Sequence, residues 1–248
     1  MRSHEIVKGF LVSGLALGGF GLGAPSAGAA DHYLIAKPVD LTMPDGTTVV
    51  PMWGFARDDG TCYAIQDGGD PDSEASKLAR VGAAACQDPV ASVPGPRLTV
   101  PPADTDLRVF LVNLLPEAAS IVVPGQEMPV PMGPTWGDGS VGARPDASAR
   151  VHSFGVEAAA NGGRQQYRWT AGDSNAFQVG TFLYESGTHP QVQVQMGLYG
   201  AVTRNAAAGF AYAGIGFDAE RNLFFSEVDP ALHGAVDAGT FSGSTSTA

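Results

Sequence analysis

Short apolar runs separated by turn signals make up most of the sequence from residue 31 onwards. The runs are rich in Val, Leu, Phe, Tyr and Thr, which favour half-buried strands. Pro-Gly, Asp-Gly and Asn-Gly pairs lie between the runs and supply turns. The pattern predicts strands at residues 33–36, 47–55, 98–100, 107–114, 120–123, 165–170, 180–185 and 191–202.

Alternation is clearest at residues 191–196, where glutamines and apolar residues take turns. A period of two puts alternate side chains on opposite faces of a strand, so we expect a strand here with its glutamines in water. Only residues 73–85 favour a helix. Many short strands at fairly regular spacing are typical of an all-β sandwich or barrel with Greek-key connections and long irregular loops.

Composition and charge narrow the class of protein. Among 248 residues, 44% are hydrophobic and 16% charged, which excludes a disordered chain, and the 33 Gly and 18 Pro disfavour a helical bundle. The formal net charge of −11 repels phosphate backbones, so nucleic acid is not expected as a partner.

The first thirty residues have the order of a secretory signal. Basic residues come first, an apolar run follows, and the stretch ends in small residues around Ala27, Gly28 and Ala29. We expect cleavage near Ala29 or Ala30, with export to the periplasm or the extracellular space. No later segment is apolar enough to span a membrane, so the processed chain is expected to have no membrane partner.

Cys62 and Cys86 are the only two cysteines. In an exported chain an even pair is typical of a disulfide, and neither cysteine has a His, Lys or Arg beside it that would favour a thiolate. We therefore expect a structural Cys62–Cys86 bond, which by loop entropy stabilises the fold by about 3 kcal/mol.

Four segments in order carry a resemblance to a known family. The first two, at residues 94–100 and 104–116, resemble strands of the first cupredoxin (plastocyanin-like) domain of multicopper oxidases, and residues 180–184 and 195–202 resemble its closing strands. The similarity covers about residues 47–55 and 90–205 and implies a cupredoxin-like fold.

The resemblance also implies a division of the chain. Residues 1–30 would be the signal and residues 31–205 the cupredoxin-like domain. The apolar run at residues 222–227 predicts a further strand, and residues 224–229 are similar to the opening strand of a next domain. Residues 206–248 would therefore be a frayed linker and the start of an incomplete second domain.

Copper is the family's cofactor, and its trinuclear centre takes imidazoles from two His-x-His patterns in this domain. By the resemblance, Val122 and Pro124 stand at the first pair of positions, and Glu185 and Gly187 at the second. None of the ligand assignments transfers, so we expect no catalytic, cofactor-binding or metal residue in this chain. Copper would sit in further cupredoxin domains, in a longer parent chain or a homo-oligomer.

The leading hypothesis is therefore an exported scaffold domain of a copper-dependent oxidoreductase, not catalytic alone. A second hypothesis is a small copper-binding or carrier module that uses His189 and His152, with Met196 as an optional third ligand, since imidazole and thioether suit copper. A third is a cofactor-free interaction domain. Its aromatic candidates are Trp53, Phe182 and Tyr184, more typical of a core, and Trp136, which lies in a Gly- and Pro-rich stretch.

Hydrolase motifs are absent from the sequence: there is no nucleophile elbow, zinc-protease helix motif or phosphate loop. Glu157, Glu185 and Asp173 could be paired as acid and base, but nothing in their spacing requires it.

Overall fold

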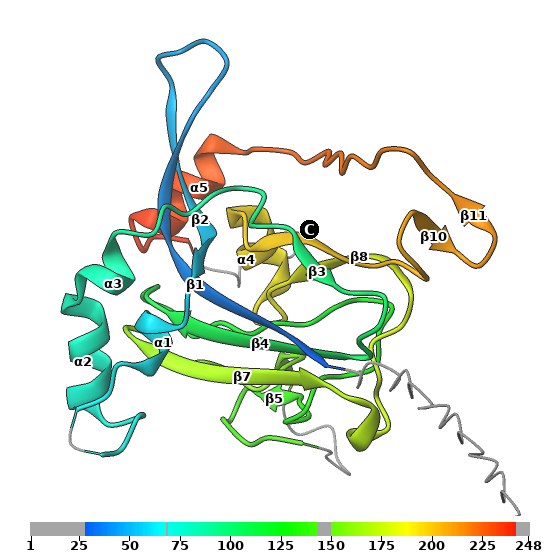
Figure 1. Cartoon of the computed structure of the whole chain (residues 1–248). Helices are drawn as coiled ribbons and strands as arrows, with labels where there is room; N and C mark the ends of the chain where they lie inside the picture. The colour runs from blue at the N-terminus through cyan, green and yellow to red at the C-terminus, as the bar shows by residue number, and fades with distance from the viewer. Residues whose placement is uncertain (1–27, 68, 143–149, 242–248) are drawn as a thin grey trace, which may run out of the picture.

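The computed structural model describes residues 28–67, 69–142 and 150–241 (Figure 1). Most of the regular structure in these ranges is strand. The strands are β1 (Ala29–Thr42), β2 (Val49–Asp58), β3 (Leu98–Val100), β4 (Asp106–Asn113), β5 (Thr135–Trp136), β6 (Val151–Ser153), β7 (Gly163–Trp169), β8 (Gly180–Glu185), β9 (Tyr199–Arg204), β10 (Phe210–Tyr212) and β11 (Ile215–Gly216). The helices are α1 (Thr61–Ala64), α2 (Glu74–Gly82), α3 (Ala84–Gln87), α4 (Pro190–Met196) and α5 (Pro230–Asp237), with a 3₁₀ turn at Ala171–Asp173.

Two mixed sheets form the body of the fold. One has the order β2-β1-β4-β7, in which β1 pairs antiparallel with β2 and parallel with β4. The other has the order β3-β9-β8, with β3 parallel and β8 antiparallel to β9. The predicted all-β sandwich is therefore confirmed, and the pairings β5-β6 and β10-β11 are small additions to it.

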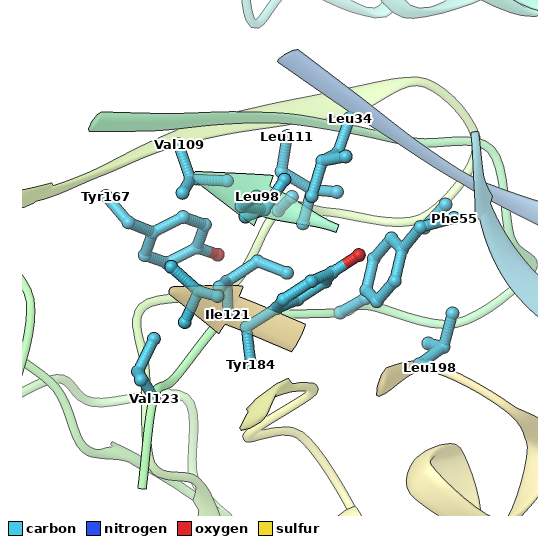
Figure 2. Close-up of a cluster of buried hydrophobic side chains, with 14 of the residues drawn as sticks. Leu34, Phe55, Leu98, Val109, Leu111, Ile121, Val123, Tyr167, Tyr184 and Leu198 are labelled. Carbon is cyan, nitrogen blue, oxygen red and sulfur yellow. The ribbon is translucent and has the colours of Figure 1, made fainter. Parts of the chain in front are cut away.

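The main core lies between the two sheets (Figure 2). Leu34 and Leu111 come from the first sheet and Tyr184 from the second, and all three are fully buried. The buried phenols are paired: Tyr184 donates to the carbonyl of Pro96 at 2.8 Å, and Tyr167 donates to that of Val156 at 2.7 Å. These two hydrogen bonds let aromatic rings fill the core without leaving a buried hydroxyl unpaired.

Cys62 and Cys86 form the predicted disulfide, with an S–S distance of 2.03 Å. Both are fully buried in a second, smaller core with Ile35, Ala56 and Val112. This core lies on the side of the first sheet where α1, α2 and α3 pack. The prediction of a structural bond is confirmed.

Most predicted strands are present. The runs at 33–36, 47–55, 98–100, 107–114, 165–170 and 180–185 correspond to β1, β2, β3, β4, β7 and β8. The run at 120–123 makes one bridge pair, Val122 with Glu185, rather than a continuous strand. The predicted helix at 73–85 is α2, whose N-cap Ser73 accepts a hydrogen bond from the Ser76 amide.

The strand predicted at 191–202 is wrong in its first half, which is α4. Pro190 occupies the first turn, where its missing N–H costs nothing, and Gly197 ends the helix at a φ of 118°. The buried side chains are Val192, Gln193 and Met196, which share one helical face. Gln193 is therefore inside the protein and not on a wet strand face.

The strand expected at residues 222–227 is also wrong, because these residues form no strand in the structure. The chain instead passes from the β10-β11 hairpin through an extended segment to α5, which lies against β2 (Figure 1). Leu232 and Val236 pack on the main core, and His233 is fully buried with Nδ1 3.1 Å from the carbonyl oxygen of Pro51. The division of the chain at residue 205 stays a prediction.

The predicted signal lies mostly outside the described residues. Of its last residues, Ala29 begins β1 and Ala30 is buried opposite Leu107 of β4. Export stays a prediction. No helix in the described ranges has the length and apolar character needed to cross a bilayer.

Candidate functional site

The two segments that the resemblance assigns to copper ligands lie side by side. Val122 and Glu185 form an antiparallel bridge, in which each amide donates to the other's carbonyl, at 2.9 and 3.0 Å. The sequence places these residues far apart, and the fold brings their segments together at the outer edge of β8. The backbone bridge therefore makes Val122 and Glu185 neighbours in the fold.

The side chains at these positions do not fit copper. Val122, Pro124 and Gly187 carry no nitrogen, oxygen or sulfur in their side chains, so only Glu185 offers a donor. The space is filled as well: a Cβ added to Gly187 would lie 2.8 Å from Cγ1 of Val122 and 3.0 Å from Oγ of Ser120.

Glu185 is half-buried, and burial raises the pKa of its carboxyl. It lines a cavity of about 240 Å³ with Tyr199, Phe224 and Glu227. The ring of Phe224 lies 6.0 Å from that of Tyr199, so the extended segment before α5 forms one wall of the cavity. Two carboxylates, Glu185 and Glu227, line this cavity among mainly apolar walls, and among the described residues no catalytic partner lies beside them that would define a reaction.

Three buried hydroxyl groups lie behind Gly187. Ser120, Ser153 and Thr188 are almost completely buried and bond to one another, with oxygen–oxygen distances of 2.8, 2.9 and 3.1 Å. The three hydroxyls satisfy each other, which removes the cost of burying them. No histidine nitrogen bonds to any of them among the hydrogen bonds of the described residues, so the cluster joins three segments and is not an activated nucleophile.

His152 and His189, the two histidines of the second hypothesis, lie in contact, although their spacing in the sequence matches no ligand motif. Their ring centroids are 4.0 Å apart with an interplanar angle of 71°. The amide of His189 donates to the carbonyl of His152 at 3.2 Å, and the neighbouring residues Ser153 and Thr188 form a bridge pair. Backbone pairing between β6 and the start of α4 therefore brings the two imidazoles together.

Each imidazole also has a carboxylate near one of its ring nitrogens. Nε2 of His152 lies 3.3 Å from Oε1 of Glu157, and Nδ1 of His189 lies 4.0 Å from Oε2 of Glu117. Burial lowers the pKa of His189, and the neighbouring His152 lowers it further. Sequence reasoning missed these carboxylates as partners, because their spacing from the histidines follows no motif.

The other candidates take separate places. Met196 is fully buried in the main core, and Trp53 and Tyr184 are core residues, with Phe182 at the core's edge. Trp136 is half-buried, and its indole N–H donates to the carbonyl of Gly142 at 2.7 Å.

The three carboxylates that could be paired as acid and base have different neighbours. Glu157 faces His152 and Glu185 lines the cavity beside Phe224, whereas Asp173 accepts a hydrogen bond from the Thr170 hydroxyl. No acid–base pair arises from them. Within the ranges that the structure describes, no three His, Cys, Asp or Glu side chains are already placed to hold a metal ion.

The two mixed sheets and the packing between them define an all-β sandwich. The structure is similar to a multicopper oxidase from Pseudomonas thermotolerans, at 22% identity and a TM-score of 0.43, over 72% of this chain and 30% of that one. It is also similar to a copper nitrite reductase from Nitrosomonas europaea, at 17% identity and a TM-score of 0.40, over 71% of this chain and 41% of that one.

A multicopper oxidase from Campylobacter jejuni, described as a metallo-oxidase, matches at 18% identity and a TM-score of 0.38, over 71% of this chain and 26% of that one. This chain thus spans less than half the length of these similar structures. Because all three TM-scores lie below 0.5, we draw nothing about function from them. No family model matches the sequence, and curated proteins give no significant match.

Proposed function

We propose that this chain is an exported scaffold domain of a multicopper-oxidase-like protein and supplies structure or an interdomain face instead of copper ligands. The observation that carries the proposal is the packing of Val122 against Gly187, where the resemblance expects imidazoles. A valine fills the space at one position, and the other has no room for a side chain. Copper would then be held by a further cupredoxin domain, in the same polypeptide or in a partner.

Export has its own support. The first thirty residues have the order of a secretory signal, and the Cys62–Cys86 bond is of the kind that persists in oxidising compartments. Both features agree with the periplasm or the extracellular space as the place of action.

The proposal is tested by measuring dioxygen consumption by the purified full chain after loading with copper(II). A hydroquinone serves as the electron donor, and the same copper concentration in buffer is the control. We expect no consumption above that control, because the chain has too few imidazoles for a trinuclear centre. Dioxygen reduction that depends on the chain would overturn the scaffold proposal.

A second test concerns the partner that holds the copper. The reading frame, or a gene next to it, is expected to encode another cupredoxin domain with a His-Cys-His run. Co-expression of the two products and size-exclusion chromatography should then recover them together. If copper-binding domains are absent both from the reading frame and from the proteins that co-purify with this chain, then the proposal that this chain is one domain of a copper enzyme is wrong.

A further inference from the structure

A cluster of two imidazoles and two carboxylates lies beside the buried hydroxyls of Ser153 and Thr188 and includes none of the four positions that the resemblance assigns to copper ligands. It consists of Glu117, His152, Glu157 and His189, and we call it the histidine–carboxylate cluster. The backbone bonds between β6 and the start of α4 hold the two histidines, and Glu157 follows β6 by a few residues. The cluster is therefore built on segments that the sandwich itself positions.

The spacing of His152 and Glu157 suits two ligands of one metal ion. Tetrahedral bonds of about 2.0–2.2 Å place two donor atoms about 3.4 Å apart, and Nε2 of His152 lies 3.3 Å from Oε1 of Glu157. That oxygen is buried and, although Nε2 of His152 is near, accepts no aligned hydrogen bond from the described residues. A buried carboxylate oxygen without an aligned donor is costly, and a cation bound by both atoms would remove that cost.

The outer half of the cluster is partly exposed to solvent, and Oε2 of Glu117 also accepts a long hydrogen bond from Nε2 of Gln193 at 3.5 Å. The side chains of His189 and Glu117 are 41% and 45% exposed, and their facing atoms are 4.0 Å apart. Both line a cavity of about 280 Å³ that also contacts Val236 and Phe241. The four side chains do not surround one point as they stand, so binding requires His189 and Glu117 to turn towards the ion.

We propose that the histidine–carboxylate cluster binds one divalent transition-metal ion, with His152, Glu157 and His189 as ligands and Glu117 closing the site. Two imidazoles with carboxylates favour zinc(II) or copper(II) over calcium or magnesium, which prefer oxygen alone. Copper(I) is disfavoured, because Met196 is buried in the core and both cysteines are bonded to each other.

The test is calorimetric titration of the full chain, freed of metal and without an affinity tag, with zinc(II) and separately with copper(II). We expect one site per chain of micromolar affinity or better for at least one of the two ions. His189→Ala and His152→Ala should each weaken it by more than the roughly 10- to 100-fold that losing an outer-shell partner costs. Glu157→Gln should weaken it too. His32→Gln is the matched control, because His32 faces the carbonyl of Thr99 instead.

Electron paramagnetic resonance of the copper(II) form gives a second readout. Coupling to two imidazole nitrogens is expected, and one nitrogen should disappear in His189→Ala. Absence of saturable binding by either ion would overturn the proposal. So would binding that persists in a folded His152→Ala/His189→Ala variant, which would place the ion elsewhere. Metal binding here without dioxygen consumption leaves the scaffold function intact, so the two proposals can fail separately.

Discussion

Gly187 packs so closely on its neighbours that a single methyl group tests the arrangement at the ligand positions. Its added Cβ would meet Val122 at 2.8 Å, far inside normal contact. Gly187→Ala is therefore expected to lower the free energy of unfolding by about 1–3 kcal/mol, the usual cost of overpacking. Urea-induced unfolding of the purified chain measures the change.

A second substitution, Val122→Ala, tests whether the contact with Val122 causes the loss of stability expected in Gly187→Ala. Val122→Ala removes the nearest atom, so Gly187→Ala and Val122→Ala together should cost less than the sum of their separate costs. Gly172→Ala is the control, because Gly172 is exposed and an added Cβ there meets nothing within 4 Å. Strict additivity of the first two changes would mean that Val122 does not occupy the space beside Gly187.

At the residue level, the sequence predicted which side chains are candidates for a site better than it predicted which side chains contact them. The pairing of Cys62 with Cys86 followed from there being only two cysteines. The contact of His152 with His189 depends on the bridge between Ser153 and Thr188, a non-local pairing that no periodicity reveals. Long-range backbone pairing, rather than local pattern, decided which side chains meet.

Among the elements, α4 gives the clearest contrast between helix and strand. In a strand Gln191 and Gln193 would share a face, but in the helix Gln191 is exposed and Gln193 is fully buried. The Gln193 amide accepts from the Ser186 hydroxyl at 2.6 Å and donates to the Ala118 carbonyl at 2.8 Å. Gln193→Leu is expected to cost about 1–3 kcal/mol through these lost partners.

Gln191→Leu is the matched control and should change the free energy of unfolding by less than about 0.5 kcal/mol, as surface changes usually do. Thermal and urea unfolding of both variants provide the measurement. Equal effects of the two substitutions would contradict the helix and restore the strand prediction.

The failure at residues 191–196 has a physical reason. Six residues of alternation are too few to distinguish a strand from one face of a short helix. Pro190 and Gly197 are start and stop signals for a helix, and here they outweighed the alternation. The flanking β8 was predicted with its observed bounds, whereas β9 was predicted only as the end of the run at 191–202 and extends to Arg204.

The β1-β2 hairpin, which projects from the sandwich (Figure 1), contains a carboxylate that titrates unusually low. The Thr48 hydroxyl and the amides of Thr47 and Thr48 donate to Asp45 and lower its pKa to about 2. Because folding lowers this pKa, the turn is favoured fully above about pH 4, the ordinary aspartate range. That contribution is lost as the pH falls towards 2.

A pH titration followed by NMR checks this behaviour. The amide signals of Thr47 and Thr48 should shift with a midpoint near the pKa of Asp45, well below pH 4, and Asp45→Asn should abolish the transition. A midpoint at the ordinary aspartate value would contradict the bonded turn.

For the whole molecule, the two sheets were predictable but the path of the chain after β9 was not. Residues 222–227 have the apolar character of a strand, yet a strand needs a neighbour to pair with, and no described segment offers one. Side chains hold the segment instead: Phe224 contacts Tyr199, and Glu220 pairs with Arg97 at 2.7 Å. Its structure therefore depends on a surface that only the folded sandwich supplies.

Residues 206–241 form an arm that follows β9. Truncation of the chain tests whether this arm belongs to the sandwich domain. Ending the chain after residue 205 removes Leu232 and Val236 from the core and the buried His233 from β2. Partial burial of two aliphatic side chains contributes about 2–4 kcal/mol, so the shortened chain should unfold at correspondingly lower urea concentration. Ending it after residue 241 keeps α5 and serves as the control. Equal stability of the two variants would make the arm dispensable and would support the division of the chain at residue 205.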